Sequence, residues 1–184
     1  MKRFKKSVCL LLIAALSLLL TACGSGSAKK EFEAFSSELS ERTSLEFTAE
    51  LTAIYEDKNV DFTLAYEKDG DGCLVTVLEP KMVEGIRARV TGGGTAVEYE
   101  GIMLDTGRLD DYGLSPMTAL PMLVEAMTTA HADSFWEEGG LNAVKLLPSD
   151  TLSAVVWFDA GVPVKAELIS EGRVTVSCDI KDWK

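Results

Sequence analysis

Hydrophobic and polar residues alternate along most of the chain after residue 44, which is the pattern of half-buried β-strands. The alternation is clearest over 45–55, and a polar turn leads into a second alternating run over 60–66. Further extended segments are predicted over 73–78, 85–91, 96–104, 141–147, 152–158, 164–169 and 173–180. Short connections rich in glycine, proline and aspartate separate most of them, as in antiparallel hairpins. Because the early strands follow one another without a crossover helix, the pattern favours one large antiparallel sheet over βαβ units.

Two segments have helical periodicity instead. Apolar residues recur at helical spacing within 29–42, among several glutamates, which predicts a short amphipathic helix. A second helix is predicted over 115–130, with Ser115 as its N-cap. Pro121 is expected to kink or restart this helix, because proline lacks the backbone donor and clashes with the preceding turn.

The N-terminus has the pattern of a secretory signal. A basic start is followed by an apolar run over 8–20, and the sequence Leu20-Thr21-Ala22-Cys23 closes it. The run is too short and wrongly flanked for a membrane-spanning helix. The closing sequence resembles the lipobox of bacterial lipoproteins, which implies lipid attachment to the Cys23 sulfur, removal of 1–22 and retention at a membrane surface. An ordinary secretory signal and an uncleaved anchor are the alternatives.

This interpretation sets the domain organisation and the location. Residues 1–22 form the signal peptide, 23–28 a lipidated, flexible linker of small residues, and 29–184 one domain. The 162 residues that remain after cleavage suit one domain of ordinary size. We expect the mature protein to be extracytoplasmic and anchored to the cell membrane through Cys23.

Charge limits the classes of partner. Four of the 18 basic residues and none of the 29 acidic residues precede Cys23, which leaves a formal net charge of −15 in the mature chain. Such a surface repels phosphate backbones and anionic headgroups, which argues against nucleic acid and against electrostatic membrane binding beyond the lipid itself. The expected partner is apolar, cationic or another protein.

The sequence offers little catalytic or metal-binding chemistry. His131 is the one histidine, and we place it at the end of the 115–130 helix, without a second ligand or a paired nucleophile. The run 69–72 echoes the start of a calcium loop, but Pro80 stands where a bidentate glutamate is needed. The acidic pairs Asp110-Asp111 and Glu137-Glu138 are interpreted as solvated loop charges, with contact to a basic partner as the alternative. We therefore predict no enzyme, cofactor or metal, while a hydrolase built from two distant carboxylates would leave no local motif.

Two cysteines remain in the mature chain besides the lipidated one. Cys73 and Cys178 both fall on the apolar side of predicted strands. Outside the cytoplasm they could pair as a disulfide, or they could be two buried free thiols. Sequence spacing does not decide between the two.

About ten strands with one helical insertion behind a lipobox resemble the LolA/LolB superfamily of half-open β-barrels. The resemblance covers 45–184 and rests on the order and pattern of elements, including 78–86 (Leu78-Glu79-Pro80-Lys81-Met82-Val83-Glu84-Gly85-Ile86) and the hairpin 156–164. It implies an α+β fold, mainly β, in which one large curved antiparallel sheet carries a short N-terminal helix and a lid or plug helix around 115–130. LolA itself is not lipidated, so the lipobox points to LolB-like or other lipidated relatives, including lipid-carrying and spore-germination lipoproteins.

In such relatives the concave face holds acyl chains or a lipoprotein's lipid. Apart from Met1, the methionines all lie within 82–127, around the helical insertion. Methionine adapts to irregular apolar shapes, and here it either fills the core or lines a ligand site. The resemblance makes six residues candidates for the cavity or lid: Met103, Met117, Leu120, Leu123, Val124 and Met127.

Two functions follow from these observations. The first is a membrane-anchored lipoprotein that binds a lipid, acyl group or other apolar ligand in a half-barrel, without catalysis, as a carrier or acceptor. The alternative is a protein-interaction lipoprotein of the cell envelope or the spore germination apparatus that has no lipid ligand.

Overall fold

The structure is a computed structural model that describes residues 24–70, 72–92, 94–107 and 115–184. The predicted signal peptide and Cys23, the predicted lipid attachment site, lie outside these residues, as do Asp71 of the calcium-loop echo and the predicted loop charges Asp110 and Asp111. No helix in the described part of the chain is long and apolar enough to cross a bilayer.

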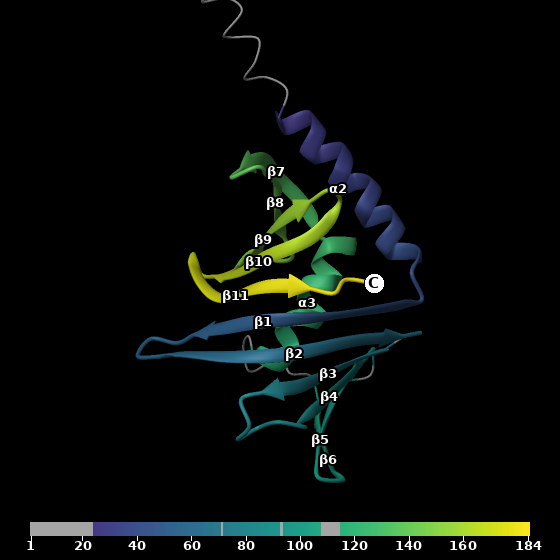
Figure 1. Ribbon diagram of the computed structural model, residues 1–184, viewed down its shortest axis with the longest axis vertical. Helices are drawn as coiled ribbons and strands as arrows, with labels where there is room; N and C mark the ends of the chain where they lie inside the picture. The colour runs from purple at the N-terminus through teal and green to yellow at the C-terminus, as the bar shows by residue number, and fades with distance from the viewer. Residues whose placement is uncertain (1–23, 71, 93, 108–114) are drawn as a thin grey trace, which may run out of the picture.

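Eleven strands of the described residues form one antiparallel sheet (Figure 1). They are β1 (Ser44–Ile54), β2 (Asn59–Asp69), β3 (Gly72–Glu79), β4 (Arg87–Thr91), β5 (Gly94–Tyr99), β6 (Ile102–Gly107), β7 (His131–Glu138), β8 (Leu141–Leu147), β9 (Leu152–Asp159), β10 (Val162–Ser170) and β11 (Arg173–Lys181). Their order in the sheet is β6-β5-β4-β3-β2-β1-β11-β10-β9-β8-β7. Two meanders are therefore joined side by side where β1 pairs with β11.

The alternating pattern of β1 determines which face of the sheet is buried. Leu45, Phe47, Ala49, Leu51 and Ala53 are at most 3% exposed, while their neighbours in sequence face the other side. In the central pairing these residues stand opposite apolar partners, as Leu51 does opposite Cys178. A slip of one residue would turn the whole set to solvent, so burial specifies the register.

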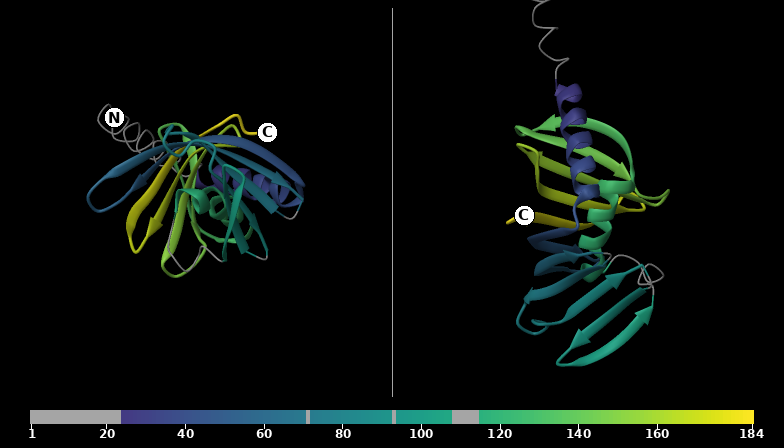
Figure 2. Two further views of the ribbon diagram at one scale, coloured as in Figure 1. Left: turned by 90° about the horizontal axis from the view of Figure 1, so that it is seen from below. Right: turned by 90° about the vertical axis from the view of Figure 1, so that its right-hand side faces the viewer.

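Two helices pack on the concave face of the curved sheet (Figure 2). They are α2 (Gly24–Glu41), which lies beside β7 and β8, and α3 (Pro116–Thr129), which packs against α2, β3, β8 and β10. A capping box starts α3: the Ser115 hydroxyl accepts from the Thr118 amide at 3.3 Å, and the Thr118 hydroxyl accepts from the Ser115 amide at 3.2 Å. The sheet and both helices share one hydrophobic core.

Several details differ from the sequence predictions. The helix α2 begins at Gly24, so 24–28 continue the helix where a flexible linker was expected; buried Ala28 packs its first turns onto the domain. The helix α3 runs through Pro121 without ending or restarting, because the cap and the burial of its inner face outweigh one lost hydrogen bond. The single strand expected over 96–104 is split by a turn at Glu100 and Gly101, both at positive φ.

The strand β7 was not predicted from the sequence. It placed His131 at the end of a helix, whereas this residue opens an edge strand that is mostly polar and has a bulge between Ala132 and Ser134. Such a strand lacks the regular alternation that identifies the others.

Of the two alternatives left open for Cys73 and Cys178, the structure has the free thiols, with Cys178 buried and Cys73 partly buried. Cys73 lies on β3 and Cys178 on β11, with β2 and β1 between them. Three strand spacings of about 4.8 Å alone separate the two by roughly 14 Å, about twice the Cα distance that a disulfide can span, and the register also offsets them along the strands.

Candidate functional site

The middle of the concave face is filled by α3. Leu120, Leu123 and Met127 are at most 1% exposed and Val124 is 6% exposed, all within the core between α3 and the sheet. Met117 is partly buried against the same core. Four of the six cavity candidates therefore act as a plug, with Met117 at its edge.

Met103 does not belong to this group, which corrects its assignment as a cavity or lid residue. It lies on β6, is 66% exposed, and stands opposite Glu98, which itself pairs with Arg87 on the convex face. The sequence analysis included it because it falls near the helix in the chain, but the topology places β6 at the far edge of the sheet.

A crevice of about 450 Å³ remains between one side of α3 and strands β2 to β4. We call it the α3 crevice. Its walls come from Pro121, Val124, Glu125 and Thr128 of α3 and from Tyr66, Lys68, Cys73, Val90 and Thr91 of the sheet, with glycines at its end. The volume lies in the range of small-molecule sites, about 300–1,000 Å³.

The floor of the α3 crevice is electrically neutral. Burial, and secondarily interaction with Cys73, raises the pKa of Tyr66 well above its ordinary value. Burial likewise raises the pKa of the Cys73 thiol, against the smaller opposing effect of its hydrogen bond with Tyr66. Both groups stay protonated at neutral pH, so Cys73 is a poor nucleophile. Lys68 and Glu125 supply one charge of each sign, and the Lys68 Nζ donates to the Arg42 carbonyl at 3.1 Å.

A second crevice, of about 400 Å³, lies on the other side of α3. Met122, Thr129 and His131 line it together with the β8–β9 turn around Pro148. His131 is exposed here. No group of three or more histidine, cysteine or acidic residues in the described part of the chain could hold a metal ion.

The hairpin of β5 and β6 extends past α3 at one end of the sheet (Figure 2). We call it the edge hairpin. Tyr99, Ile102 and Leu104 are 42%, 73% and 64% exposed. Their register with Val97 and Ala88 places them on the concave face, the same face as the α3 crevice. Apolar surface is thus available both in the crevice and on the hairpin.

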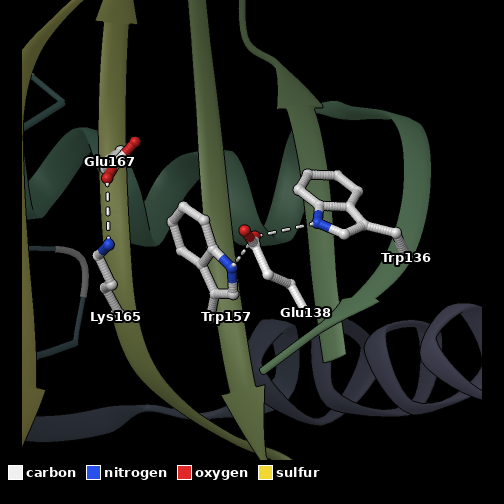
Figure 3. A network of polar contacts seen from close by, with 5 residues as sticks. All are labelled: Trp136, Glu138, Trp157, Lys165 and Glu167. Carbon is white, nitrogen blue, oxygen red and sulfur yellow. Dashed lines mark hydrogen bonds and ion pairs between the residues drawn. The ribbon is translucent and has the colours of Figure 1, made fainter. Parts of the chain in front are cut away.

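The convex face carries an aromatic cluster that the sequence analysis missed (Figure 3). Trp157 and Trp136 donate their indole N–H groups to Oε2 of Glu138, at 3.1 and 3.3 Å. The Lys165 Nζ lies 4.6 Å from the centre of the Trp157 ring and 3.2 Å from Glu167 Oε1. Glu138 is therefore a hydrogen-bonded acceptor, where the sequence suggested a solvated loop charge.

One feature of the sequence could have revealed this cluster. The run from Ala154 to Phe158 has no polar residue, and all five side chains are buried. A strand that is apolar on both faces needs cover on both, and on the convex face Trp157 packs with Val155, Ala143 and the partly buried Trp136.

The cluster leads to a prediction about pH. Hydrogen bonds from Trp157 and then Trp136 hold the pKa of Glu138 below its ordinary value. A carboxyl group with a lowered folded pKa stabilises the fold above its unfolded pKa, and this contribution is lost as pH falls through the folded pKa.

We expect wild type to melt at a higher temperature than Glu138→Gln at neutral pH, and this difference in melting temperature to narrow below about pH 4. Tryptophan fluorescence melts from pH 7 to pH 3 measure it, and a gap that is constant or widens with acid contradicts it. Glu137→Gln is the control.

Comparison with known proteins bears on the fold. No protein-family model matches the chain, and neither does any curated protein sequence. A domain assigned to outer membrane lipoprotein sorting in Vibrio parahaemolyticus is similar in structure, with 14% identity, 85% of this chain and 92% of that chain covered, and a TM-score of 0.50. An uncharacterized conserved protein from Thermus thermophilus matches at 11% identity, with 85% and 86% covered and a TM-score of 0.51. A LolA superfamily protein from Nitrosomonas europaea matches at 13% identity, with 89% and 94% covered and a TM-score of 0.47.

At these identities the likeness establishes a shared fold. The match to the lipoprotein-sorting domain extends over most of both chains. In this chain the matched fold consists of one large open antiparallel sheet and two helices. The predicted α+β, LolA-like half-barrel is therefore confirmed as the fold.

Proposed function

We propose that the chain is a cell-envelope lipoprotein, tethered through Cys23, that binds an acyl chain or a similar apolar group in the α3 crevice and catalyses no reaction. The observation that carries the proposal is the crevice itself. It is a site of about 450 Å³ with a neutral floor, between a helix and the concave face of an open sheet. The carrier-type fold is consistent with it.

The chemistry of the walls supports an apolar ligand with a polar end. Val90, Val124 and Pro121 offer apolar contact, while Lys68 and Glu125 offer one charge of each sign. Tyr66 and Cys73 satisfy each other, so the floor needs no polar group from a ligand. An acyl chain in the crevice would contact the apolar side chains, and a carboxylate at its end would pair with Lys68.

The plug limits how deep this ligand lies. Leu120 and Met127 are not exposed at all, so the space under α3 is occupied by protein. A single chain fits beside the helix without moving it, whereas a ligand with several chains has to displace α3. The proposal is therefore for a ligand the size of one acyl chain.

The sequence predicts a lipid anchor at Cys23, and the fold connects this residue to the sheet through α2. Cys23 directly precedes α2, an 18-residue helix that packs on β7 and β8. Lipidation of Cys23, with 1–22 removed, then holds the domain at the membrane through a packed helix. The domain limits of 29–184 are best extended to include the whole of α2.

Two neighbouring threonines make a matched test. Thr128 lines the α3 crevice and Thr129 lines the crevice on the other side of the helix, and both hydroxyls donate to the Glu125 carbonyl at 2.9 Å. We expect Thr128→Trp to abolish binding of a fluorescent fatty acid by filling the site, and Thr129→Trp to leave it unchanged. Titrations of the full chain in detergent measure the affinity, and mass spectrometry of purified protein identifies lipid that co-purifies. Equal binding by both variants, or none by wild type, rules out the crevice as the site.

A protein-interaction role is the second candidate, favoured by the edge hairpin. Ile102, Met103 and Leu104 are consecutive, apolar and at least 64% exposed. Absence of co-purifying lipid together with an intact fold favours this role over lipid binding.

A further inference from the structure

The two edges of the sheet differ in how well they are protected. The edge strand β7 has α2 beside it, contains a bulge, and presents Asp133, Glu137 and Glu138. These are the usual means by which a sheet avoids pairing with another chain. At the other edge, β6 has no further strand beside it in the described part of the chain. It pairs with β5 in continuous register from Ile102 to Asp105, and the register shifts between Asp105 and Gly107.

Over 102–104 the side chains of β6 are apolar on both faces. Ile102 and Leu104 point to the concave face and Met103 to the convex face, and all three are at least 64% exposed. No proline or lysine interrupts the strand. Over 102–104 the edge is exposed, apolar and regular, and such an edge is a template for one more strand.

From these observations we infer that β6 pairs with an extended segment of another protein, which has apolar residues at alternate positions and basic residues near its ends. The apolar positions would cover Ile102 and Leu104. The basic residues follow from charge, because Glu100 lies at the hairpin turn next to β6 and the mature chain carries a formal net charge of −15.

The same charges argue against a second copy as the occupant. Each mature chain carries a formal net charge of −15, so two copies meeting at this edge repel each other. A basic segment is attracted to the acidic chain, whereas a second copy is repelled by it.

The position of the edge argues against the anchoring membrane as the occupant. The helix α2 starts beside β7 at one end of the long axis, and β6 lies at the opposite end (Figure 1). If Cys23 holds the start of α2 at the bilayer, as proposed above, β6 faces away from it. The inference depends on the proposed anchor for this step alone and is independent of the α3 crevice.

The test uses the full chain in detergent and a synthetic nine-residue peptide that alternates isoleucine with threonine and has lysine at each end. We expect saturable binding, together with slowed amide hydrogen exchange in β6 but not in β7. The same peptide with glutamate in place of lysine should bind at least about tenfold more weakly. Leu104→Lys should weaken binding of the lysine peptide about tenfold or more, because it places a charge on the edge.

Two control variants distinguish the edge hairpin from exposed apolar side chains elsewhere and from the α3 crevice. Met82→Lys changes another apolar side chain, 87% exposed on the β3–β4 connection, and should leave the affinity unchanged. Thr128→Trp should also leave it unchanged, so loss of lipid binding and loss of peptide binding are distinguishable. Because Leu104 is 64% exposed, Leu104→Lys should melt like wild type.

Four results would overturn the inference: no saturable binding, equal binding of the two peptides, an equal effect of Met82→Lys, or protection of β7 together with β6. A dimeric mass by light scattering, lost in Leu104→Lys, assigns the edge to a second copy instead. Slowed exchange of β6 in phosphatidylcholine vesicles without peptide assigns it to the bilayer instead.

Discussion

Replacing Leu120 by alanine is expected to lower the free energy of unfolding by about 2–5 kcal/mol. Leu120 is not exposed at all and lies on the face of α3 that fills the concave side of the sheet. Truncation removes apolar contacts and leaves a cavity between the helix and the sheet, which well-packed surroundings close only in part. Chemical denaturation followed by circular dichroism measures the change.

The control for this prediction lies on the same helix. Met122→Ala also truncates a large apolar side chain, but Met122 is only partly buried and lines the crevice of about 400 Å³ beside β8 and β9. We expect it to cost less than about 1 kcal/mol. If the two variants lose equal stability, α3 is not a packed plug, and a mobile lid over a larger site becomes the better description.

The Leu120 variant also bears on ligand size. A cavity under α3 makes room that wild type lacks, since the plug residues there are at most 6% exposed. If apolar ligands bind only beside the helix, the affinity for a single acyl chain is unchanged in this variant. Tighter binding to Leu120→Ala than to wild type would show that the ligand reaches the space beneath the helix.

Most of the sheet could be predicted because its strands alternate strictly. In β1 the odd-numbered residues from Leu45 to Ala53 are buried, as the pattern requires for a strand covered on one face. Most connections between strands carried glycine or proline at the right places. Both helices were predicted from periodicity, and the N-cap of α3 from Ser115.

The errors occur where local pattern does not determine the structure. The edge strand β7 is mostly polar and bulged, so nothing in its sequence separates it from a loop. The pairing of β1 with β11 brings together the two ends of the domain, and no local signal specifies it. Without this topology, the sequence does not show that Met103 lies away from α3, or that Cys73 lies far from Cys178.

The cavity candidates lie near the α3 crevice, but most of them do not line it. Five of the six lie on α3 against the core, and of the six only Val124 lines the α3 crevice. The polar half of the crevice, with Tyr66, Lys68 and Glu125, was not anticipated. These residues meet only because β2 curves under the helix, which a one-dimensional pattern does not contain. The tryptophan cluster at Glu138 was missed for the same reason, since its partners come from β7 and β9.

Phe158→Ala is expected to destabilise the fold by about 3–5 kcal/mol and to loosen α2 in particular. The ring of Phe158 contacts two rings of α2 edge to face, Phe35 at 5.0 Å and Phe32 at 6.0 Å between ring centres. Contacts of this kind stabilise by about 0.5–1.5 kcal/mol beyond burial.

Hydrogen exchange distinguishes local loosening from general loss of stability. Phe158 joins α2 to the centre of the β8–β10 half of the sheet, so its removal should speed exchange in α2 more than in β1 and β2. Tyr55→Ala, which removes an aromatic ring that is 45% exposed at the β1–β2 turn, should affect neither. If amide exchange accelerates equally across the whole sheet in Phe158→Ala, Phe158 has no specific role in docking α2. If the effect is specific to α2, this helix connects the proposed anchor to the sheet. It directly follows Cys23 and packs against the sheet through these rings.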